Sequence, residues 1–486
     1  MDLEGKTIYG VLWSIGQELS SKFISFFITI LLARILSPAE FGLIAMLYVF
    51  IAVGNSLLDS GLTSSLIRTP EVSQKDCSTV FYFNLMGSVA VYLLLYLTAP
   101  LIASFYHQPI LSNVVRVYGL ALIINAFFGI QQTLLVKEMK FKTMTMIQIP
   151  SVLGGGILGV VLAKLGYGVW SLVWMSLFNS LISTVLHWYC SSWRPILLFD
   201  KTSFKSHFNY GYKLTLSGLI DKLYQNIYAI LIGRFYAPAQ LGFYSRADSI
   251  SQLPIGIISS AINKVTFPMF VKIADDAEQL LNVYKKIMLQ VLFWMAPTLV
   301  ALAVIAEPLF RLVLTEKWLP AVPYFQILCI AGVMYPIHAY NLNILKVKGQ
   351  TNLFLKLEII KKVLCVIGIV CVFPFGIYGL LYFQLFFSFF AFYINSIYSA
   401  RFINYPFLKQ VEDILPTLLI SGFIGLAVFF LDQFLVSIGF DDLFRILLLG
   451  LSYFICYFAV CFLFKLSAIV DFKQLIQKRL STTSPT

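Results

Sequence analysis

Apolar segments long enough to cross a lipid bilayer follow one another along almost the whole chain. A membrane-spanning helix needs about 20 mostly apolar residues, and short connections join fourteen such segments here. Of the 486 residues, 59% are hydrophobic and only 12% are charged, whereas ordinary soluble domains carry about 25% charged residues. The sequence therefore predicts an all-α integral membrane protein with about 14 transmembrane helices. The predicted spans are residues 8–33, 41–66, 78–103, 113–135, 144–163, 167–189, 211–233, 241–269, 287–310, 322–345, 357–374, 377–400, 414–436 and 443–464.

The distribution of Lys and Arg predicts how these spans are oriented. With the N-terminus in the cytoplasm, the loops on the cytoplasmic side hold roughly four times as many Lys and Arg as the opposite loops, as the positive-inside rule requires. We therefore expect both termini to be cytoplasmic. The net charge of +12 then reflects basic loops beside anionic lipid, so the lipid bilayer is the expected partner and nucleic acid is not.

A short motif occurs twice, 200 residues apart. Residues 30–42 align with residues 230–242, and the two copies share the pattern Arg-x3-Pro-Ala-x2-Gly. Each copy joins an odd-numbered span to the next one, so the two halves have the same orientation. The sequence predicts two parallel six-helix repeats, an arrangement typical of transporters, followed by two further helices. The predicted domains are an N-terminal lobe at 1–209, a C-terminal lobe at 210–405, and a helix pair with a cytoplasmic tail at 406–486.

Charged residues within the spans point to a hydrated interior. Each one costs on the order of 2.5–3.5 kcal/mol at a helix centre unless it meets a partner or water. They concentrate in the first, second, seventh and eighth spans, and Lys22 overlays Lys222 under the repeat. We therefore expect a central, hydrated cavity with a net positive charge. The cations are Lys22, Lys222, Arg246 and Lys264, and the acids are Glu18, Asp59, Asp221 and Asp248.

The residue types leave several roles open. The four cations suit the binding of an anionic substrate, although Lys264 is equally able to extend to the membrane surface. The acids either pair with neighbouring cations or hold a coupling H+ or Na+. His338 has two possible roles: it either titrates during function or is a hydrogen-bonded residue of the helix packing. Prolines within spans predict kinks or breaks at Pro254, Pro268, Pro297 and Pro336.

Motifs for enzyme chemistry are absent from the sequence. It contains no GxxxxGK[ST] nucleotide loop, no HExxH and no GxSxG, which are the patterns for ATP binding, zinc hydrolysis and serine catalysis. We expect a transporter that is not an enzyme and that needs no cofactor other than a coupling ion.

Three loop segments carry a resemblance to a known family. The chain resembles Wzx-type polysaccharide flippases, of the multidrug/oligosaccharidyl-lipid/polysaccharide (MOP) exporter superfamily, and within them the colanic acid exporter (WzxC-like) branch. The likeness covers nearly the whole chain, although the last two spans share only hydrophobicity. The segments are residues 32–43 (LARILSPAEFGL), 267–276 (FPMFVKIADD) and 316–320 (EKWLP).

The resemblance implies a function in the bacterial inner membrane. Such a protein moves undecaprenyl-pyrophosphate-linked oligosaccharide repeat units to the periplasmic leaflet by alternating access, for O-antigen or exopolysaccharide synthesis. A polysaccharide polymerase and chain-length machinery are implied as further partners. A related lipid II flippase uses cavity Arg residues on its first and eighth spans. This chain has Lys22 and Arg246 on the corresponding spans. Their positions match those of the cavity Arg residues, but the motif around them does not, so their roles are hypotheses.

Two other functions compete with this interpretation. A MATE-type cation-coupled drug exporter of the same superfamily should have a more apolar or acidic cavity. A membrane-embedded polysaccharide polymerase usually carries a large periplasmic loop, whereas the longest outer connection here is about residues 311–321.

Overall fold

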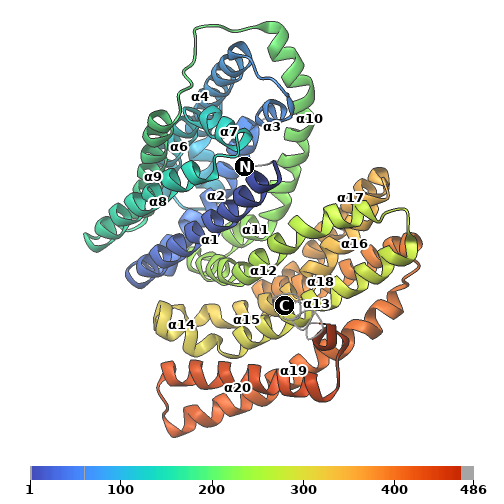
Figure 1. The fold of residues 1–486 in the computed structure, drawn as a ribbon. Helices are drawn as coiled ribbons and strands as arrows, with labels where there is room; N and C mark the ends of the chain where they lie inside the picture. Colours follow the sequence, from blue (N-terminus) through green and yellow to red (C-terminus); the bar gives the residue numbers. More distant parts are fainter. Residues whose placement is uncertain (1–2, 60, 472–486) are drawn as a thin grey trace, which may run out of the picture. The chain divides into compact units, whose positions relative to one another are not determined.

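The computed structural model describes residues 3–59 and 61–471, and this part of the chain is helical with no strand (Figure 1). The side chains of Glu18, Asp59 and Lys264 lie outside the described residues. The predicted all-α fold class is confirmed. The chain forms two compact units, Met1–Ser245 and Arg246–Thr486, and the predicted lobe boundaries at 209/210 and 405/406 remain predictions.

The first unit contains eleven helices and the start of a twelfth. These are α1 (Leu3–Ile35), α2 (Pro38–Asp59), α3 (Leu62–Arg68), α4 (Gln74–Phe105), α5 (Ile110–Tyr118), α6 (Leu120–Ala126), α7 (Gly129–Lys137), α8 (Phe141–Lys164), α9 (Val169–Cys190), α10 (Lys201–Gln225), α11 (Ile227–Phe235) and α12 (Pro238–Lys272). Helix α12 continues into the second unit.

The second unit contains the remaining helices. These are α13 (Ala277–Val304), α14 (Ala306–Leu314), the 3-10 helix η1 (Glu316–Ala321), α15 (Val322–Gly332), α16 (Tyr335–Val347), α17 (Thr351–Val372), the 3-10 helix η2 (Phe373–Phe375), α18 (Gly376–Ile403), α19 (Phe407–Ile438) and α20 (Asp442–Leu463).

Length and hydropathy identify membrane spans among the described residues. Nine helical segments are long and apolar enough to cross a membrane, or ten when the pair Ile110–Ala126 and Gly129–Lys137, bent by 45°, counts as one span. One of the nine, Thr351–Ile403, contains both α17 and α18. Helices α1, α10 and α12 contain side chains that lie outside the described residues, and these three helices carry most of the charges that the sequence places within spans. The helix order is consistent with fourteen spans.

The repeated motif meets its own copy in the first unit. In both copies one helix ends three residues before a proline that starts the next helix, at Pro38 for α2 and Pro238 for α12. A Cβ atom on Gly42 would lie 1.8 Å from the carbonyl oxygen of Pro238, and one on Gly242 would lie 1.9 Å from that of Pro38. This reciprocal contact, which we call the glycine clasp, is the geometry of a local two-fold axis. It explains why the motif contains glycine at the same place in both copies.

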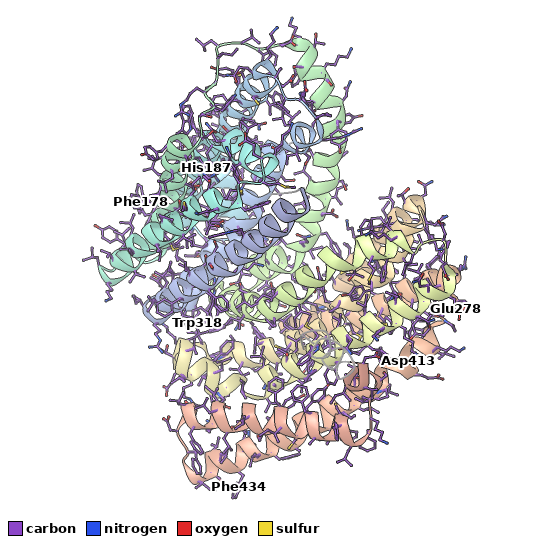
Figure 2. All side chains as sticks on the ribbon, in the orientation of Figure 1. Phe178, His187, Glu278, Trp318, Asp413 and Phe434 are labelled. Atoms are coloured by element: carbon purple, nitrogen blue, oxygen red, sulfur yellow. The ribbon has the colours of Figure 1, made fainter. Side chains whose placement is uncertain are left out.

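An aromatic core joins the last two helices, α19 and α20, to the rest of the second unit. Phe293 of α13 packs with Tyr453 and Tyr457 of α20, and the Tyr457 hydroxyl donates to the Phe293 carbonyl oxygen at 2.9 Å. Trp318 in η1, labelled in Figure 2, is fully buried in the same unit. Helices α19 and α20 therefore pack into the second unit through specific contacts as well as apolar surface.

A buried charge network fastens α19, α20 and α14 at one end. Arg445 is 2% exposed and donates to both carboxylate oxygens of Asp432, at 2.9 and 3.0 Å. It also donates to Asp442 at 2.7 Å, and Asp442 accepts from Arg311 at 3.3 Å. Burial acts to lower the pKa of Arg311, but Asp442 and Glu307 outweigh it and raise this pKa above its ordinary value.

Removing one partner of the Arg445–Asp432 pair should destabilise the protein. Asp432→Leu leaves a guanidinium buried with half of its partners gone, which costs about 3–5 kcal/mol. Replacing both residues, as in Asp432→Leu with Arg445→Met, removes the uncompensated charge and should recover most of the loss. Thermal unfolding of the purified protein in detergent measures both variants. Equal unfolding temperatures for the single and double variants would contradict this account of the pair.

Candidate functional site

A cavity of about 870 Å³ opens within the first unit. Its walls come from α2, α3, α4, α6, α7 and α10. The volume lies in the range of about 300–1,000 Å³ that ligand sites occupy. The cavity is therefore large enough to hold part of a substrate.

Three helix breaks border this cavity. Helices α2 and α3 are separated at Gly61, which has a positive φ of 61°. Helices α6 and α7 are separated by Phe127 and Phe128, and α10 and α11 by Asn226. Gly61 and Phe128 are lining residues, and Lys222 lies in the last turn of α10. Broken helices occur at membrane depth where they line a cavity or bind a substrate, so this geometry indicates a binding site.

Close packing places α10 against the first break. A Cβ atom on Gly61 would lie 2.6 Å from both Cα and the carbonyl oxygen of Gly211. On the next turns of α10, Thr215, Gly218 and Lys222 reach the cavity. A side chain at either glycine would move α10 away from the cavity wall.

The lining is polar but almost uncharged. Among the described residues that line the cavity, Lys222 is the one that carries a charge, and within the described part of the chain its amine forms no ion pair. The other polar lining residues carry amide or hydroxyl groups. They are Tyr48, Asn55, Ser56, Thr63, Ser64, Asn84, Asn125, Gln132, Thr133 and Thr215.

One amide in the lining has an unsatisfied buried atom. Asn84, on α4, is 9% exposed, and its Oδ1 accepts no hydrogen bond from the described residues. Buried polar atoms are normally paired, because an unpaired one costs about 1–3 kcal/mol. An acceptor in this position fits a ligand that donates a hydrogen bond.

An aromatic ring at the break between α6 and α7 is held in place from behind. Phe128 lines the cavity and stacks on His187 of α9, with ring centroids 4.7 Å apart and planes 19° apart. His187, labelled in Figure 2, is buried, and its Nδ1 lies 2.7 Å from the Ser183 carbonyl oxygen. The Phe128 ring is therefore a fixed part of the wall.

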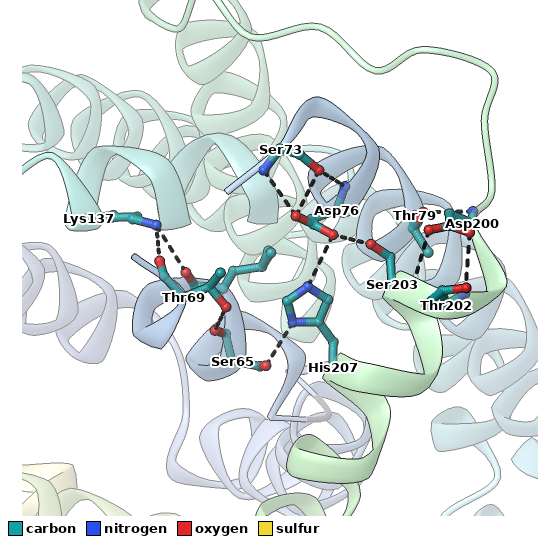
Figure 3. Close-up of polar contacts among 11 residues, drawn as sticks. Ser65, Thr69, Ser73, Asp76, Thr79, Lys137, Asp200, Thr202, Ser203 and His207 are labelled. Atoms are coloured by element: carbon teal, nitrogen blue, oxygen red, sulfur yellow. Dashed lines mark hydrogen bonds and ion pairs between the residues drawn. The ribbon is translucent and has the colours of Figure 1, made fainter. Parts of the chain in front are cut away.

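A polar cluster ties α10 to α3 and α4 (Figure 3). His207 of α10 is buried, with Nδ1 2.8 Å from Ser65 Oγ on α3 and Nε2 3.6 Å from Asp76 Oδ1 on α4. Ser203, also on α10, donates to the same carboxylate. Helices α3 and α4 both contribute to the cavity wall, so this cluster fixes the helix that carries Lys222 against two of its neighbours.

The structure brings only part of the predicted cationic set to this cavity. Lys222 lines it, whereas Lys22 is half-buried on α1 and is not a lining residue. Asp221, next to Lys222, is half-buried and has a polar partner of its own. The side chains of Glu18 and Asp59 lie outside the described residues.

The remaining predicted residues belong to the second unit. Arg246 and Asp248 are half-buried on α12, and Asp248 accepts from Gln252 one turn later at 3.5 Å. The side chain of Lys264 lies outside the described residues. His338 on α16 has its Nε2 3.4 Å from Ser388 Oγ on α18, a contact of the kind that a packing role requires.

Sequence reasoning missed the uncharged part of the site. All the site residues that it proposed are charged, whereas Asn84, Asn125 and Gln132 all line the cavity. The available signal was an amide within an apolar run, such as Asn84 within the predicted span 78–103. That signal is weak, because an amide in a membrane helix often bonds only to a neighbouring helix.

The fold and the cavity together define a multi-pass membrane transporter. Helix breaks beside a ligand-sized cavity and a motif repeated at two helix junctions are typical of this class. Residues 31–323, more than half of the chain, match the family described as "Polysaccharide biosynthesis protein". The chain therefore belongs to the polysaccharide biosynthesis protein family, which confirms the resemblance seen in the sequence.

Curated relatives come from several bacteria. The chain is 28% identical to the lipopolysaccharide biosynthesis protein WzxC of Escherichia coli (strain K12) over 372 residues, which cover 76% of each chain. It is 31% identical to the teichuronic acid biosynthesis protein TuaB of Bacillus subtilis (strain 168), over 61% of this chain and 62% of TuaB. It is 24% identical to the succinoglycan biosynthesis transport protein ExoT of Rhizobium meliloti (strain 1021), over 70% and 68%.

Solved structures with a similar fold are transporters. The lipid II flippase MurJ in an inward closed conformation matches 96% of this chain and 100% of its own, with a TM-score of 0.72 and 14% identity. A multidrug resistance MATE family transporter of the MOP superfamily, in an inward-facing conformation, matches 79% and 94%, with a TM-score of 0.60 and 16% identity. The family match and the curated relatives confirm the prediction of a polysaccharide biosynthesis transporter that is not an enzyme, and the solved structures confirm the fold.

Proposed function

We propose that the protein is a flippase that moves undecaprenyl-pyrophosphate-linked oligosaccharide repeat units across the bacterial inner membrane for polysaccharide synthesis. In this proposal it works by alternating access, with both termini in the cytoplasm. The relatives' names support a role in polysaccharide synthesis, and the MurJ-like fold supports a lipid-linked cargo. A polymerase and chain-length machinery would then receive the product on the periplasmic side.

The observation that carries the proposal is that Lys222 is the one charged residue among the described lining residues of a polar cavity, within an apolar protein. A lysine amine in such a cavity attracts phosphate or carboxylate groups, and it disfavours the cationic drugs that the competing exporter would carry. We assign Lys222 to the substrate's anionic group, with Lys22, Arg246 and Lys264 as further contacts at other stages of transport. The acids Glu18, Asp59, Asp221 and Asp248 are proposed to pair with these cations or to hold a coupling H+ or Na+.

Deletion of the gene followed by analysis of lipid-linked glycans tests the proposed function. The deletion strain should lose its polysaccharide and accumulate oligosaccharide lipid on the cytoplasmic face of the membrane, where an added impermeant glycosidase cannot reach it in intact spheroplasts. Restoring the gene is the control. Accumulation of single repeat units on the periplasmic face would instead indicate a polymerase and would overturn the proposal.

A further inference from the structure

We infer that the cavity of the first unit recognises the sugar portion of the cargo, and that this cargo is a hydroxyl-rich glycan with few charges. This inference rests on the proposed function. In this inference the amide residues of the lining form a subsite that binds the glycan. The cations have a different role, which is to bind the phosphate groups.

The chemistry of the wall matches hydroxyl groups. An Asn or Gln side chain offers one acceptor and two donors, and a sugar hydroxyl both donates and accepts. Asn55, Asn84, Asn125 and Gln132 come from three different walls of the cavity, on α2, α4 and the α6–α7 segment. A set of amides around one space can therefore bond several hydroxyl groups at once, which a purely apolar or purely cationic lining cannot do.

Asn84 provides the second, independent observation. Its side chain is 91% buried, its Oδ1 accepts no hydrogen bond from the described residues, and it lines the cavity. Leucine has a similar size and would leave no polar atom unsatisfied, so asparagine costs stability here. A ligand hydroxyl that donates to Oδ1 accounts for this cost.

Two aromatic rings complete the subsite. Tyr48 is exposed on α2 and Phe128 is held by its stack on His187, and both Tyr48 and Phe128 line the cavity. The face of an aromatic ring carries partial negative charge, so it attracts the polarised C–H groups on one face of a sugar ring. Lys222 then offers one site for an acidic group, and the other described lining residues carry no charge that would compensate further negative charges.

Binding of two lipids by the purified full-length protein in lipid nanodiscs tests the inference. The first probe is the lipid-linked oligosaccharide extracted from the deletion strain, and the second is undecaprenyl pyrophosphate, which has the same lipid and phosphates but no sugar. The wild-type protein should bind the first about tenfold more tightly. Asn84→Leu and Gln132→Leu should reduce this preference to about twofold or less and leave undecaprenyl pyrophosphate binding unchanged, since each lost hydrogen bond is worth about 1 kcal/mol.

Asn113→Leu is the matched control. Asn113 is exposed on α5 and does not line the cavity, so its variant should behave like the wild type. Asn84→Leu should unfold at the same temperature as the wild type or higher, because it removes an unsatisfied buried atom. Gln132 is exposed, which keeps its variant informative if Asn84→Leu folds poorly.

The outcomes separate the two proposals. Equal affinity of the wild type for both lipids, or full preference retained in the Gln132→Leu and Asn84→Leu proteins, would overturn the glycan subsite and leave the flippase proposal standing. Binding of neither lipid would overturn both.

Discussion

Replacing Lys222 with alanine should lower export of the polysaccharide about 10- to 100-fold while the protein still inserts normally into the membrane. A hydrogen bond to a charged group contributes about 1.5–3 kcal/mol, and each 1.4 kcal/mol corresponds to a factor of about ten. No other described lining residue carries a charge that could replace this amine. Lys22→Ala combined with Lys222→Ala should abolish export. The measurement is cell-surface polysaccharide per unit of membrane-inserted protein.

Two further variants make this result specific. Lys222→Arg keeps the positive charge and should retain most of the export. Lys164, at the exposed end of α8, does not line the cavity, so Lys164→Ala should export at the wild-type level. Unchanged export in the Lys22→Ala, Lys222→Ala double variant would refute a cationic substrate site.

The sequence predicted the membrane helices well because the polar groups of a backbone in lipid must all be hydrogen-bonded within the protein, and few structures achieve this. Long apolar runs can only form helices there, and the observed helices cover the predicted spans. The sequence singled out Lys222 because an ionised side chain within a span is costly without a partner or water. Lys222 lines the cavity, and its role in substrate binding stays a prediction. The repeat places Lys22 and Lys222 at equivalent positions, but it did not predict that their environments differ. Lys222 lines the cavity and Lys22 does not.

The helix breaks show what local sequence could not supply. Proline predicted breaks at four places, and the chain breaks close to one of them, Pro336, at the start of α16, while α13 runs on through Pro297. The breaks around the cavity, at Phe127–Phe128 and at Asn226, contain no proline. Contacts between helices distant in sequence, such as the stack of Phe128 on His187, surround these breaks. A single sequence does not reveal such packing, nor that Asn84 Oδ1 is buried without a hydrogen bond from the described residues.

Gly42→Ala should impair transport strongly, although alanine is the better helix former. Within a helix, Gly to Ala normally stabilises by roughly 0.5–1 kcal/mol. At the glycine clasp the new Cβ would lie 1.8 Å from the Pro238 carbonyl oxygen, and backbone atoms cannot change rotamer to relieve the overlap. Overpacking of this kind costs about 1–3 kcal/mol or more, so α2 and the start of α12 must separate. Export should fall at least about tenfold, with the unfolding temperature in detergent unchanged or lower.

The symmetry of the contact gives this prediction its control. Gly242 makes the reciprocal approach, with its Cβ position 1.9 Å from the Pro38 carbonyl oxygen, so Gly242→Ala should impair export to a similar degree. Gly422, on α19, has nothing within 4 Å of its Cβ position, and Gly422→Ala should export normally. If the Gly42→Ala protein had the export and the unfolding temperature of the wild type, the glycine clasp would be needed neither for transport nor for stability. A defect in only one clasp variant would show that the repeated motif has lost its equivalence. Equal defects in both, with normal membrane insertion, would mean that transport requires this close approach of the two copies.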